Sequence, residues 1–368
     1  MRISPLLKIR IGRLFGIILS WTILSIAFFI YEYYAVRFYA PEVAEEIDIG
    51  FNVFINMFAG ILAGILGGPF LVFSVSEKAR NRPFYFGILY TAIGFLIIYI
   101  VISFSISLFV FSNNLELPFY NKKVLKATLA NILAIWQIKN LLVWLIIIST
   151  TQFILQISDK FGPDNLWKFI KGKYYNPREE QRIFMFLDLK SSTSIAEKIG
   201  HVKYYNLLND FYSVITDPIV NYYGEIYQYV GDEIVITWNL NNKRHKNRSV
   251  DCFFNIQNQV TKQKEKFLNL YGLVPEFKAG IHCGKVTVGE IGILKRDIIY
   301  SGDVLNTSSR IQEACNEFNT ELLVSEDIVK LISEPGNYLI NNIGEIAFKG
   351  KTNKVRIFSI KKEDGCYH

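Results

Sequence analysis

Two short stretches of the sequence each place a carboxylate at a sharp turn of the backbone. In FLDLKSST, the apolar run 183–187 predicts a buried strand, and Asp188 follows where the strand gives way to a helix. In YVGDEIVITW, Gly231 and Asp232 lie between two β-rich runs, which is typical of a two-residue hairpin turn. A carboxylate beside the free N–H groups of a helix start can hold a divalent cation against a phosphate. Together the two stretches predict a two-metal site for phosphate chemistry.

A third stretch, residues 300–314, predicts a helix that carries an amide and a guanidinium on one face. Asn306 and Arg310 are four residues apart, about one helical turn, so their side chains project side by side. The amide is suited to orienting a sugar, and the guanidinium to neutralising a phosphoryl group in its transition state. Taken alone, this pair also fits a solvated helix face, just as Asp188 fits a helix cap and the Gly-Asp pair a plain turn.

The elements around these residues are predicted to alternate between helix and strand, which indicates an α/β sandwich. We expect helices at 194–219 and 251–270, strands at 277–282, 285–291 and 321–324, and a final hairpin around Gly350. His282 falls at a strand end, but no second His or Cys follows at metal-binding spacing, so a structural role is expected.

The segment from about Arg182 to Ile360 resembles the class III nucleotidyl cyclase catalytic domain of adenylyl and guanylyl cyclases. Four motifs occur in the order found in that family. They are FLDLKSST, YVGDEIVITW, AGIHCGKVTVGEIG, and LNTSSR with FKGKTNKV after it. The resemblance implies a ferredoxin-like α/β catalytic domain over residues 182–362.

The resemblance also implies a homodimer whose two sites lie at the subunit interface. Each site would combine the metal ligands Asp188 and Asp232 of one chain with Asn306, Arg310 and Lys351 of the other. With two divalent cations, Mg²⁺ or Mn²⁺, the ribose 3′-oxygen attacks the α-phosphorus and pyrophosphate leaves. By role, Asn306 orients the ribose, Arg310 stabilises the α-phosphoryl charge, and Lys351 contacts the terminal phosphates. The remaining implied positions are Leu189 beside the metal ligands, and Ser192, Thr193 and Lys295 on the substrate; both lysines also fit a plain surface role.

The base pocket departs from the family pattern. Three residues before the Gly-Asp pair, adenylyl cyclases have Lys and guanylyl cyclases Glu, whereas this chain has Gln228. The second base-pocket position is Asp or Thr in adenylyl cyclases and Cys in guanylyl cyclases, and here it is Ile299. The Gln228 amide pairs with either purine, but Ile299 leaves guanine's extra polar groups unpaired, at about 1 to 3 kcal/mol each. We therefore expect ATP as the substrate, with GTP as the alternative.

Two further functions are open. The sequence Gly231-Asp232-Glu233 is similar to the Gly-Gly-Asp-Glu-Phe signature of diguanylate-type enzymes, but Val230 replaces its first Gly, and the helix that carries Asn306 and Arg310 is foreign to those enzymes. The other is a non-catalytic receptor whose cyclase-like domain only binds nucleotide or a partner. Such domains usually lack a metal Asp or the arginine, and this chain retains all of them.

The N-terminal half, residues 1–157, is predicted to be a membrane domain with four transmembrane helices. Four apolar runs are each long enough to cross a bilayer. Lys and Arg gather before the first run and between the second and third, so both ends are expected to face the cytoplasm. We therefore expect a multi-pass protein of the cell membrane, plasma or inner, with a cytoplasmic catalytic domain. The runs are 15–34, 53–75, 84–111 and 141–157.

The positive charge of the chain belongs mainly to this membrane half. Up to Ser158 the sequence has 12 Lys and Arg against 7 Asp and Glu, which accounts for five of the net seven positive charges. The basic balance therefore follows membrane topology, and no nucleic-acid partner is predicted. The four cysteines lie after residue 250 without metal-like spacing, as expected for reduced thiols.

A stripe of small residues marks the second apolar run. Gly60, Gly64 and Gly68 recur at every fourth position, a spacing that permits close contact between helices. The contact can form within one chain or between two chains. We expect packing within the chain.

The stretch 125–136, on the outer side, predicts an amphipathic helix. Apolar residues recur at helical spacing and lysines stand at its start, which is typical of a helix lying on the membrane surface. The alternative is that this helix covers a ligand site in the four-helix bundle. The interfacial role is the one we expect.

Residues 158–181 are predicted to be a linker between the two halves. Pro163 and Pro177 interrupt it, and its charges alternate in sign over a length too short for a sustained coiled coil. A site shared by two chains is sensitive to small rotations between them. We therefore expect this segment to couple the membrane helices to the pairing of the catalytic domains.

Overall fold

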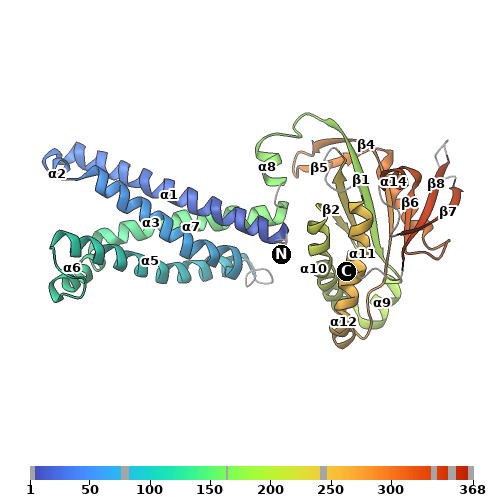
Figure 1. Ribbon diagram of the computed structural model, residues 1–368, viewed down its shortest axis with the longest axis horizontal. Coiled ribbons are helices and arrows are strands. Elements are labelled where there is room, and N and C mark those ends of the chain that lie inside the picture. The colour runs from blue at the N-terminus through green and yellow to red at the C-terminus, as the bar shows by residue number, and fades with distance from the viewer. Residues whose placement is uncertain are drawn as a thin grey trace. The chain divides into compact units, whose positions relative to one another are not determined.

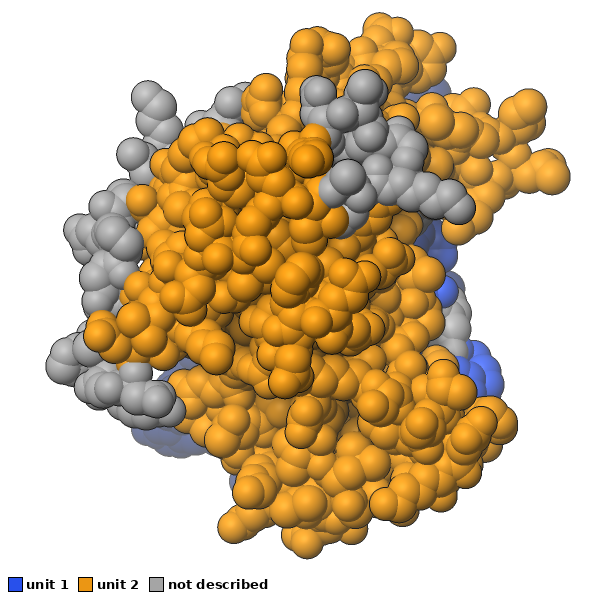
Figure 2. Space-filling model, turned by 90° about the vertical axis from the view of Figure 1, so that its right-hand side faces the viewer, with its two compact units in different colours: residues 1–3, 7–166 blue, residues 4–6, 167–368 orange. Residues whose placement is uncertain are grey.

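The structure is a computed structural model that describes residues 5–75, 83–162, 165–240, 247–332, 338–346 and 354–363. Gly350, Lys351 and Cys366 lie outside these residues. The chain divides into two compact units, essentially residues 7–166 and 167–368, which Figure 2 colours blue and orange. Each unit is considered by itself.

The first unit consists mainly of four long helices, as the sequence predicted (Figure 1). All four are long and apolar enough to cross a membrane, because their most apolar windows have a mean hydropathy of 1.9 to 2.6. The second long helix continues past Pro69 as a short π-helix, η1 (Phe70–Val75). The helices are α1 (Pro5–Tyr39), α3 (Ile49–Pro69), α5 (Phe84–Asn114) and α7 (Ile135–Phe161), with short helices α2 (Pro41–Glu45) and α6 (Lys122–Ile132) between them.

The small-residue stripe packs within the chain, which confirms the expectation. A Cβ atom on Gly60 would lie 2.6 Å from the Thr22 Cα, and one on Gly64 would lie 2.7 Å from the Ile18 Cα. Any side chain at either glycine would therefore separate α3 from α1.

Trp21 lies at the centre of the helical unit and is fully buried. Its indole N–H donates a hydrogen bond to the Thr151 hydroxyl of α7 at 3.0 Å. Its ring makes edge contacts with Phe95 of α5 and Trp144 of α7, at centroid distances of 6.3 and 5.9 Å. A single residue of α1 thus joins two other long helices through aromatic packing.

Helix α6 packs through Val124 and Thr128, both fully buried, while Leu129 on its neighbouring face is more than half exposed. The polar start of the helix is capped by Asn121, whose side chain accepts a hydrogen bond from the Lys123 backbone N–H. Leu133 is likewise exposed, but Leu125 and Ile132 of the predicted stripe are half-buried. The helix expected at 125–136 ends at Ile132, and Trp136 belongs to α7. The membrane-surface role of this stretch stays a prediction.

The second unit is an α/β sandwich, as predicted. Its sheet runs in the order β2-β3-β1-β4-β6-β8-β7, and β5 pairs with β4. The central strand β1 is antiparallel to both neighbours, β3 and β4. The strands are β1 (Arg178–Leu189), β2 (Glu225–Val230), β3 (Glu233–Asn239), β4 (Phe277–Ile291), β5 (Asp297–Ser301), β6 (Leu322–Ser325), β7 (Tyr338–Ile346) and β8 (Val355–Lys362).

Helices cover the sheet on both faces. Buried side chains of α10, α11 and α12, such as Phe211, Phe253 and Phe267, form the main apolar core with β1, β3 and β4, and Figure 1 shows α10 and α11 against the sheet. Helix α13 packs on the sheet through other residues, including Val304 and Ile311. The helices are α8 (Asn165–Ile170), α9 (Ser192–Ile199), α10 (His201–Asn221), α11 (Arg248–Lys262), α12 (Lys264–Tyr271), α13 (Asp303–Ala314) and α14 (Glu326–Leu331).

Three predictions for elements of the second unit were wrong about where one element ends and the next begins. The helix expected at 194–219 is two helices, because Gly200 adopts the left-handed value φ +84° between them. The helix expected at 251–270 is likewise divided at Gln263.

The strands expected on either side of Gly284 form the single strand β4. Gly284 is not a turn residue there: a Cβ atom on it would lie 2.8 Å from a Val304 methyl group, so the glycine admits helix α13 to the sheet.

Candidate active site

Asp188 occupies the end of β1, one residue before the strand stops. In the sheet register it lies opposite Glu233 of β3 on one side and Lys278 of β4 on the other. Its carboxylate accepts a hydrogen bond from the Gln312 side-chain amide at 3.0 Å and lies 3.5 Å from the Lys278 ammonium. Lys278 also donates to the Asn316 side-chain oxygen at 3.1 Å. The carboxylate is therefore held from two neighbouring elements, β4 and α13.

Asp232 lies at the tip of the hairpin formed by β2 and β3, as predicted. Gly231 begins the turn with φ +64°, a conformation that glycine adopts without strain. The Tyr212 hydroxyl of α10 donates a hydrogen bond to the Gly231 carbonyl at 3.0 Å, and the Tyr212 ring packs on Tyr229. These contacts fix the tip of the hairpin. Asp188 pairs with Glu233 in the sheet register, so Asp232, the residue before Glu233, lies next to Asp188.

The two carboxylates and Glu233 form a cluster of negative charge. Burial and the adjacent Asp232 carboxylate raise the pKa of Asp188, although the Lys278 ammonium acts in the opposite direction. Burial, together with the charges of Asp188 and Asp232, raises the pKa of Glu233 to about 7. Such a cluster is stabilised by a bound cation, because the cation supplies the missing positive charge.

A pocket of about 400 Å³ opens beside Asp188. Its wall is the turn between β1 and α9, where Ser191 adopts the left-handed value φ +56° and helix α9 begins at Ser192. Leu189, Ser192 and Thr193, all predicted for the site, line this pocket. Hydroxyl groups and a lysine around a turn that begins a helix suit an anionic group such as a phosphate. The full lining is Asp188, Leu189, Lys190, Ser191, Ser192, Thr193, Ser194, Lys278 and Asn316.

The donor set fits a divalent cation that is bound together with its substrate. Among the residues the structure describes, no group of three or more His, Cys, Asp and Glu is arranged as a complete metal site. Mg²⁺ characteristically takes only one or two carboxylates from a protein and completes its shell with phosphate oxygens and water. Asp188 and Asp232 beside an anion-binding turn provide that arrangement.

Asn306 and Arg310 lie one turn apart on α13, as predicted. Asn306 is exposed and Arg310 half-buried, while Ser308 and Ile311 on the opposite face are fully buried. The helix lies unusually close to β4, because a Cβ atom on Gly280 would be 2.2 Å from the Gln312 backbone nitrogen. Neither Asn306 nor Arg310 belongs to the lining of the pocket beside Asp188, as far as the described residues define it.

The segments that carry Gln228 and Ile299 meet through their neighbours. The rings of Tyr227 and Tyr300 make an edge contact at 4.9 Å, and the Tyr300 backbone N–H donates to the Tyr227 hydroxyl at 3.4 Å. Gln228 is exposed and Ile299 half-buried. Lys295 is exposed and forms a 2.9 Å ion pair with Asp297. Lys351 lies outside the described residues.

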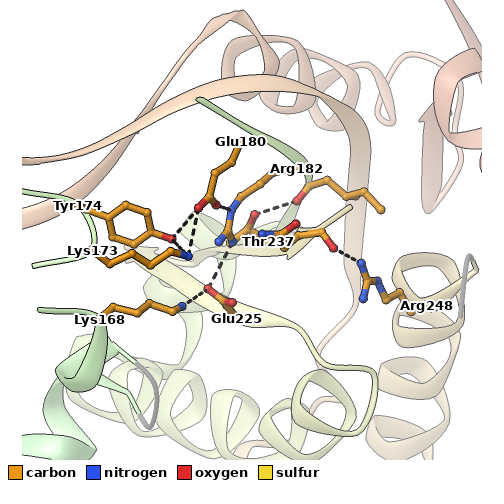
Figure 3. Close-up of polar contacts among 10 residues, drawn as sticks. Lys168, Lys173, Tyr174, Glu180, Arg182, Glu225, Thr237 and Arg248 are labelled. Atoms are coloured by element: carbon orange, nitrogen blue, oxygen red, sulfur yellow. Dashed lines mark hydrogen bonds and ion pairs between the residues drawn. The ribbon is translucent and has the colours of Figure 1, made fainter. Parts of the chain in front are cut away.

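A buried arginine contacts both of these strands, β2 and β5. Figure 3 shows its contacts with Glu180 and Glu225. Arg182 of β1 is 1% exposed, and its guanidinium contacts Glu180 at 2.8 Å and Glu225 of β2 at 3.3 Å. It also lies over the Tyr300 ring, 4.8 Å from the ring centroid. Burial alone would lower the pKa of Arg182, but the charge of Glu225 raises it, so the arginine stays charged.

The same network reaches the segment that precedes β1 (Figure 3). The Lys168 ammonium of α8 contacts Glu225 at 2.9 Å, and Lys173 contacts Glu180 at 3.2 Å. The Tyr174 hydroxyl donates a further hydrogen bond to Glu180 at 3.0 Å. Residues just before β1 thus form ion pairs with β2, the strand that carries Gln228.

Sequence reasoning missed Lys278, Gln312, Arg182 and Tyr212. Three of them left a signal. Lys278 is a lone charge inside an apolar strand, and Arg182 directly precedes one. Gln312 falls at the spacing of the buried face of α13, which made it a candidate buried polar group. Tyr212 left no such signal, because its role depends on the position of the hairpin tip.

A protein-family model described as "Adenylate and Guanylate cyclase catalytic domain" matches residues 174–362, slightly more than half of the chain. The chain belongs to this family. The match begins just before β1 and ends at the last residue of β8. The cyclase domain therefore coincides with the sheet and the helices that surround it.

Two curated relatives are adenylate cyclases. Adenylate cyclase 2 of Rhizobium meliloti (strain 1021) is 32% identical over 208 residues, which are 56% of this chain and 57% of the relative. The adenylate cyclase of Anabaena cylindrica is 25% identical over 48% of this chain and 36% of its own length. The chain thus spans between about one third and somewhat over half of these relatives. The solved structure of a bacterial light-regulated adenylyl cyclase shares the fold, with a TM-score of 0.52 and 17% identity over 64% of this chain and 68% of that one.

Proposed function

We propose that the protein is a membrane-bound adenylate cyclase that converts ATP to 3′,5′-cyclic AMP and pyrophosphate. The observation that carries the proposal is the meeting of Asp188 and Asp232 beside the turn 190–194. A carboxylate pair next to an anion-binding turn is suited to a nucleoside triphosphate with its cations. Membership of the cyclase family supports the same chemistry.

Two divalent cations, Mg²⁺ or Mn²⁺, would be held by Asp188, Asp232 and the Leu189 backbone. When bound, they make the ribose 3′-oxygen a better nucleophile and neutralise charge on the phosphates. Gln312 and Lys278 orient Asp188, since each contacts its carboxylate directly. Ser192 and Thr193 in the pocket wall are positioned to donate hydrogen bonds to the triphosphate.

The complete site requires a second copy of the chain in this proposal. Asn306 is exposed on α13, and neither Asn306 nor the half-buried Arg310 lines the pocket beside Asp188, which supports a role for both in a partner's pocket. There Asn306 would orient the ribose, and Arg310 would stabilise the charge on the α-phosphoryl group. Lys351 would contact the terminal phosphates, and Lys295 would add a further positive charge.

ATP is the proposed substrate and GTP the second candidate. Ile299, close to Gln228 through the Tyr227–Tyr300 contact, offers guanine no hydrogen-bond partner for its exocyclic amine. Gln228 serves either purine, because its amide both donates and accepts. The family includes adenylate and guanylate cyclases, which keeps GTP open.

The four apolar helices support a multi-pass protein in a lipid bilayer. We propose the cell membrane as its location, with the N-terminus and the catalytic domain in the cytoplasm, where ATP is available. The basic loops predict this orientation, since Lys and Arg are retained on the cytoplasmic side.

Turnover by the purified full-length protein tests the proposal. ATP and GTP are each supplied with Mg²⁺ or Mn²⁺, cyclic products are separated from linear ones, and Asp232→Ala is the control. Cyclic AMP that disappears in the variant supports an adenylate cyclase. Faster turnover of GTP would show that the argument from Ile299 is wrong. No product under any condition would favour a non-catalytic nucleotide receptor.

A further inference from the structure

Gln228, one of the two positions expected to read the base, directly follows an irregularity in strand β2. The residues up to Ile226 pair with β3 in one register, and the residues from Gln228 onward pair in a register shifted by one residue. Tyr227 is therefore an extra residue, and β2 forms a β-bulge there. Bulges occur beside active sites, where they change the direction of a neighbouring side chain.

The bulge decides which face of the sheet carries Gln228. Gln228 pairs with Val235 of β3, and directly paired residues of neighbouring strands project to the same face. Val235 is fully buried in the apolar cluster that also contains Phe184 and Tyr300. Without the extra residue, Gln228 would pair one position further along β3 and project to the opposite face. The backbone conformation at Tyr227 thus controls where the Gln228 amide points.

Aromatic packing holds the bulge in place. The Tyr227 ring makes edge contacts with Tyr300 of β5 and Phe184 of β1, at centroid distances of 4.9 and 6.5 Å. Phe184 and Tyr300 also make an edge contact with each other, at 5.5 Å, and Phe184 is fully buried. Edge contacts at these distances are favourable for aromatic rings. Because each of the three rings contacts the other two, the position of Tyr227 is restrained from two strands.

The same cluster joins Tyr227 to the second base position. Strands β2 and β5 are not neighbours in the sheet, since β3, β1 and β4 lie between them. The contact between Tyr227 and Tyr300 nevertheless joins them, and Ile299 directly precedes Tyr300. Arg182 of β1 joins the same two strands again, through its ion pair with Glu225 and its position over the Tyr300 ring. The separation of the two base positions therefore depends on these side-chain contacts as well as on backbone pairing.

We infer that Tyr227 is a specificity-determining positioning residue, which aims Gln228 at the base and sets its distance from Ile299. It acts through the bulge that it anchors to Tyr300, and it does not itself contact the nucleotide. The inference rests on the proposed function, because the two positions read a base only if the site binds a purine nucleotide. It deepens that function by assigning the choice between purines partly to a residue outside the base pocket.

Binding of nucleotide analogues by the full-length protein in lipid nanodiscs tests the inference. The probes are the α,β-methylene analogues of ATP and GTP with Mg²⁺, which cannot release pyrophosphate. Calorimetric titration gives the dissociation constant of each, and the ratio of the two constants measures selectivity. The kcat and KM for ATP and for GTP are measured beside it. Binding does not require turnover, so a protein that binds selectively without forming cyclic product would contradict the proposed function and not this inference.

Tyr227→Leu removes the aromatic ring, whereas Tyr227→Phe keeps it. In Tyr227→Leu the ratio of dissociation constants should move toward one by about threefold to tenfold, as the loss of an aromatic pair allows, whichever purine the wild type prefers. The change should appear in KM and leave kcat within about threefold. Tyr227→Phe should keep the wild-type ratio. Tyr300→Leu removes the same contact from β5 and should give the same loss, so the test does not depend on the folding of one variant.

Phe253→Leu is the matched control for the loss of a buried aromatic ring. Phe253 is fully buried in the main apolar core, and its ring contacts Phe254 and Phe277. This variant should lower the midpoint of thermal unfolding and keep the wild-type ratio. An unchanged ratio in Tyr227→Leu and Tyr300→Leu would overturn the inference, and so would an equal change in Phe253→Leu. A wild type that binds the two analogues equally, or binds neither, would overturn it as well.

Discussion

The two units of this protein use buried polar side chains in opposite ways. In the catalytic unit, Asp188, Asp232 and Glu233 bring negative charges together, and this raises the pKa of Asp188 and of Glu233. In the helical unit, the buried polar groups are uncharged: the Asn131 amide pairs with the Ser107 hydroxyl, whereas the Thr128 hydroxyl and the Gln152 side-chain oxygen have no hydrogen-bond partner among the described residues. Like charges are tolerated where a cation and water are available, whereas a bilayer disfavours charge and admits mainly neutral polar side chains.

The difference also appears in how each unit holds its elements together. The catalytic unit buries the fully charged network around Arg182, with Glu180 and Glu225 as partners. The helical unit relies on close backbone approach at Gly60 and Gly64 and on the aromatic contacts of Trp21. Substitutions in the two units should therefore fail for different physical reasons.

The largest expected effect is the loss of activity in Asp232→Asn. This change removes one negative charge from the carboxylate pair and should lower cyclase turnover by about 10³-fold or more, since cation stabilisation is worth several kcal/mol. The membrane unit is untouched, so expression should be normal. Turnover within tenfold of wild type would show that Asp232 is not a metal ligand.

Mixed dimers give the next largest effect. Arg310→Ala alone should be nearly inactive, because an arginine on a transferring phosphoryl group is worth about 10³ to 10⁵ in rate. Co-expression of Arg310→Ala with Asp232→Asn should restore about one quarter of wild-type activity, since half of random dimers then contain one intact site. If the mixture stays inactive while its dimers form, each site belongs to one chain.

Arg182→Ala should destabilise the catalytic unit by about 1 to 3 kcal/mol, because Glu180 and Glu225 lose the buried guanidinium and keep only Lys173 and Lys168 as charged partners. The midpoint of thermal unfolding reports the change. Arg178→Ala on the same strand is the control, since Arg178 is exposed and its loss should cost less than about 0.5 kcal/mol. Equal midpoints for the two variants would contradict a structural role for the network.

The network also predicts a pH dependence. Arg182 lowers the pKa of Glu180 and of Glu225 below the ordinary value of 4.5, against the effect of burial. The stabilisation is therefore fully present above pH 4.5 and is lost as the pH falls through the lowered values. Arg182→Ala should consequently remove part of the acid sensitivity of the catalytic unit.

Gly64→Leu should separate α1 from α3 and destabilise the helical unit by about 1 to 3 kcal/mol, as overpacking does elsewhere. Gly16→Leu on α1 is the matched control, because no atom lies within 4 Å of a Cβ atom built there. Thermal unfolding in nanodiscs and crosslinking between chains are measured together. If Gly64→Leu reduces crosslinking but not stability, the stripe joins two chains instead of two helices of one chain.

The smallest effect concerns pH and cations. Because the pKa of Glu233 is raised to about 7, its carboxyl group is protonated below that pH and the cluster loses negative charge. Mn²⁺ should therefore bind more weakly below pH 7 than above it. Its thermal stabilisation of the catalytic unit should thus shrink between pH 8 and pH 6, and Asp232→Asn should show little stabilisation at either pH.

Much of the fold was predictable because it follows from local patterns. The four apolar helices follow from run length alone, and the hairpin at Gly231 from a glycine between β-rich runs. Predictions failed where long-range packing overrode the local signal. Gly284 resembles a turn residue, but in the structure it makes room for Val304 inside a continuous strand. Strand β5 was not predicted, because its five residues pair only through their contact with β4.

The sequence by itself determined which residues could perform the chemistry. The types and spacing of Asp188, Asp232, Asn306 and Arg310 indicate phosphate chemistry at a turn and on one helix face, since side-chain chemistry and helical period are local properties. The tertiary structure decided what surrounds them. The register of β1 places Lys278 and Glu233 on either side of Asp188, and helix packing brings Gln312 to its carboxylate. It also placed Trp21 at the centre of the helical unit, because burial and aromatic packing depend on elements that are distant in the chain.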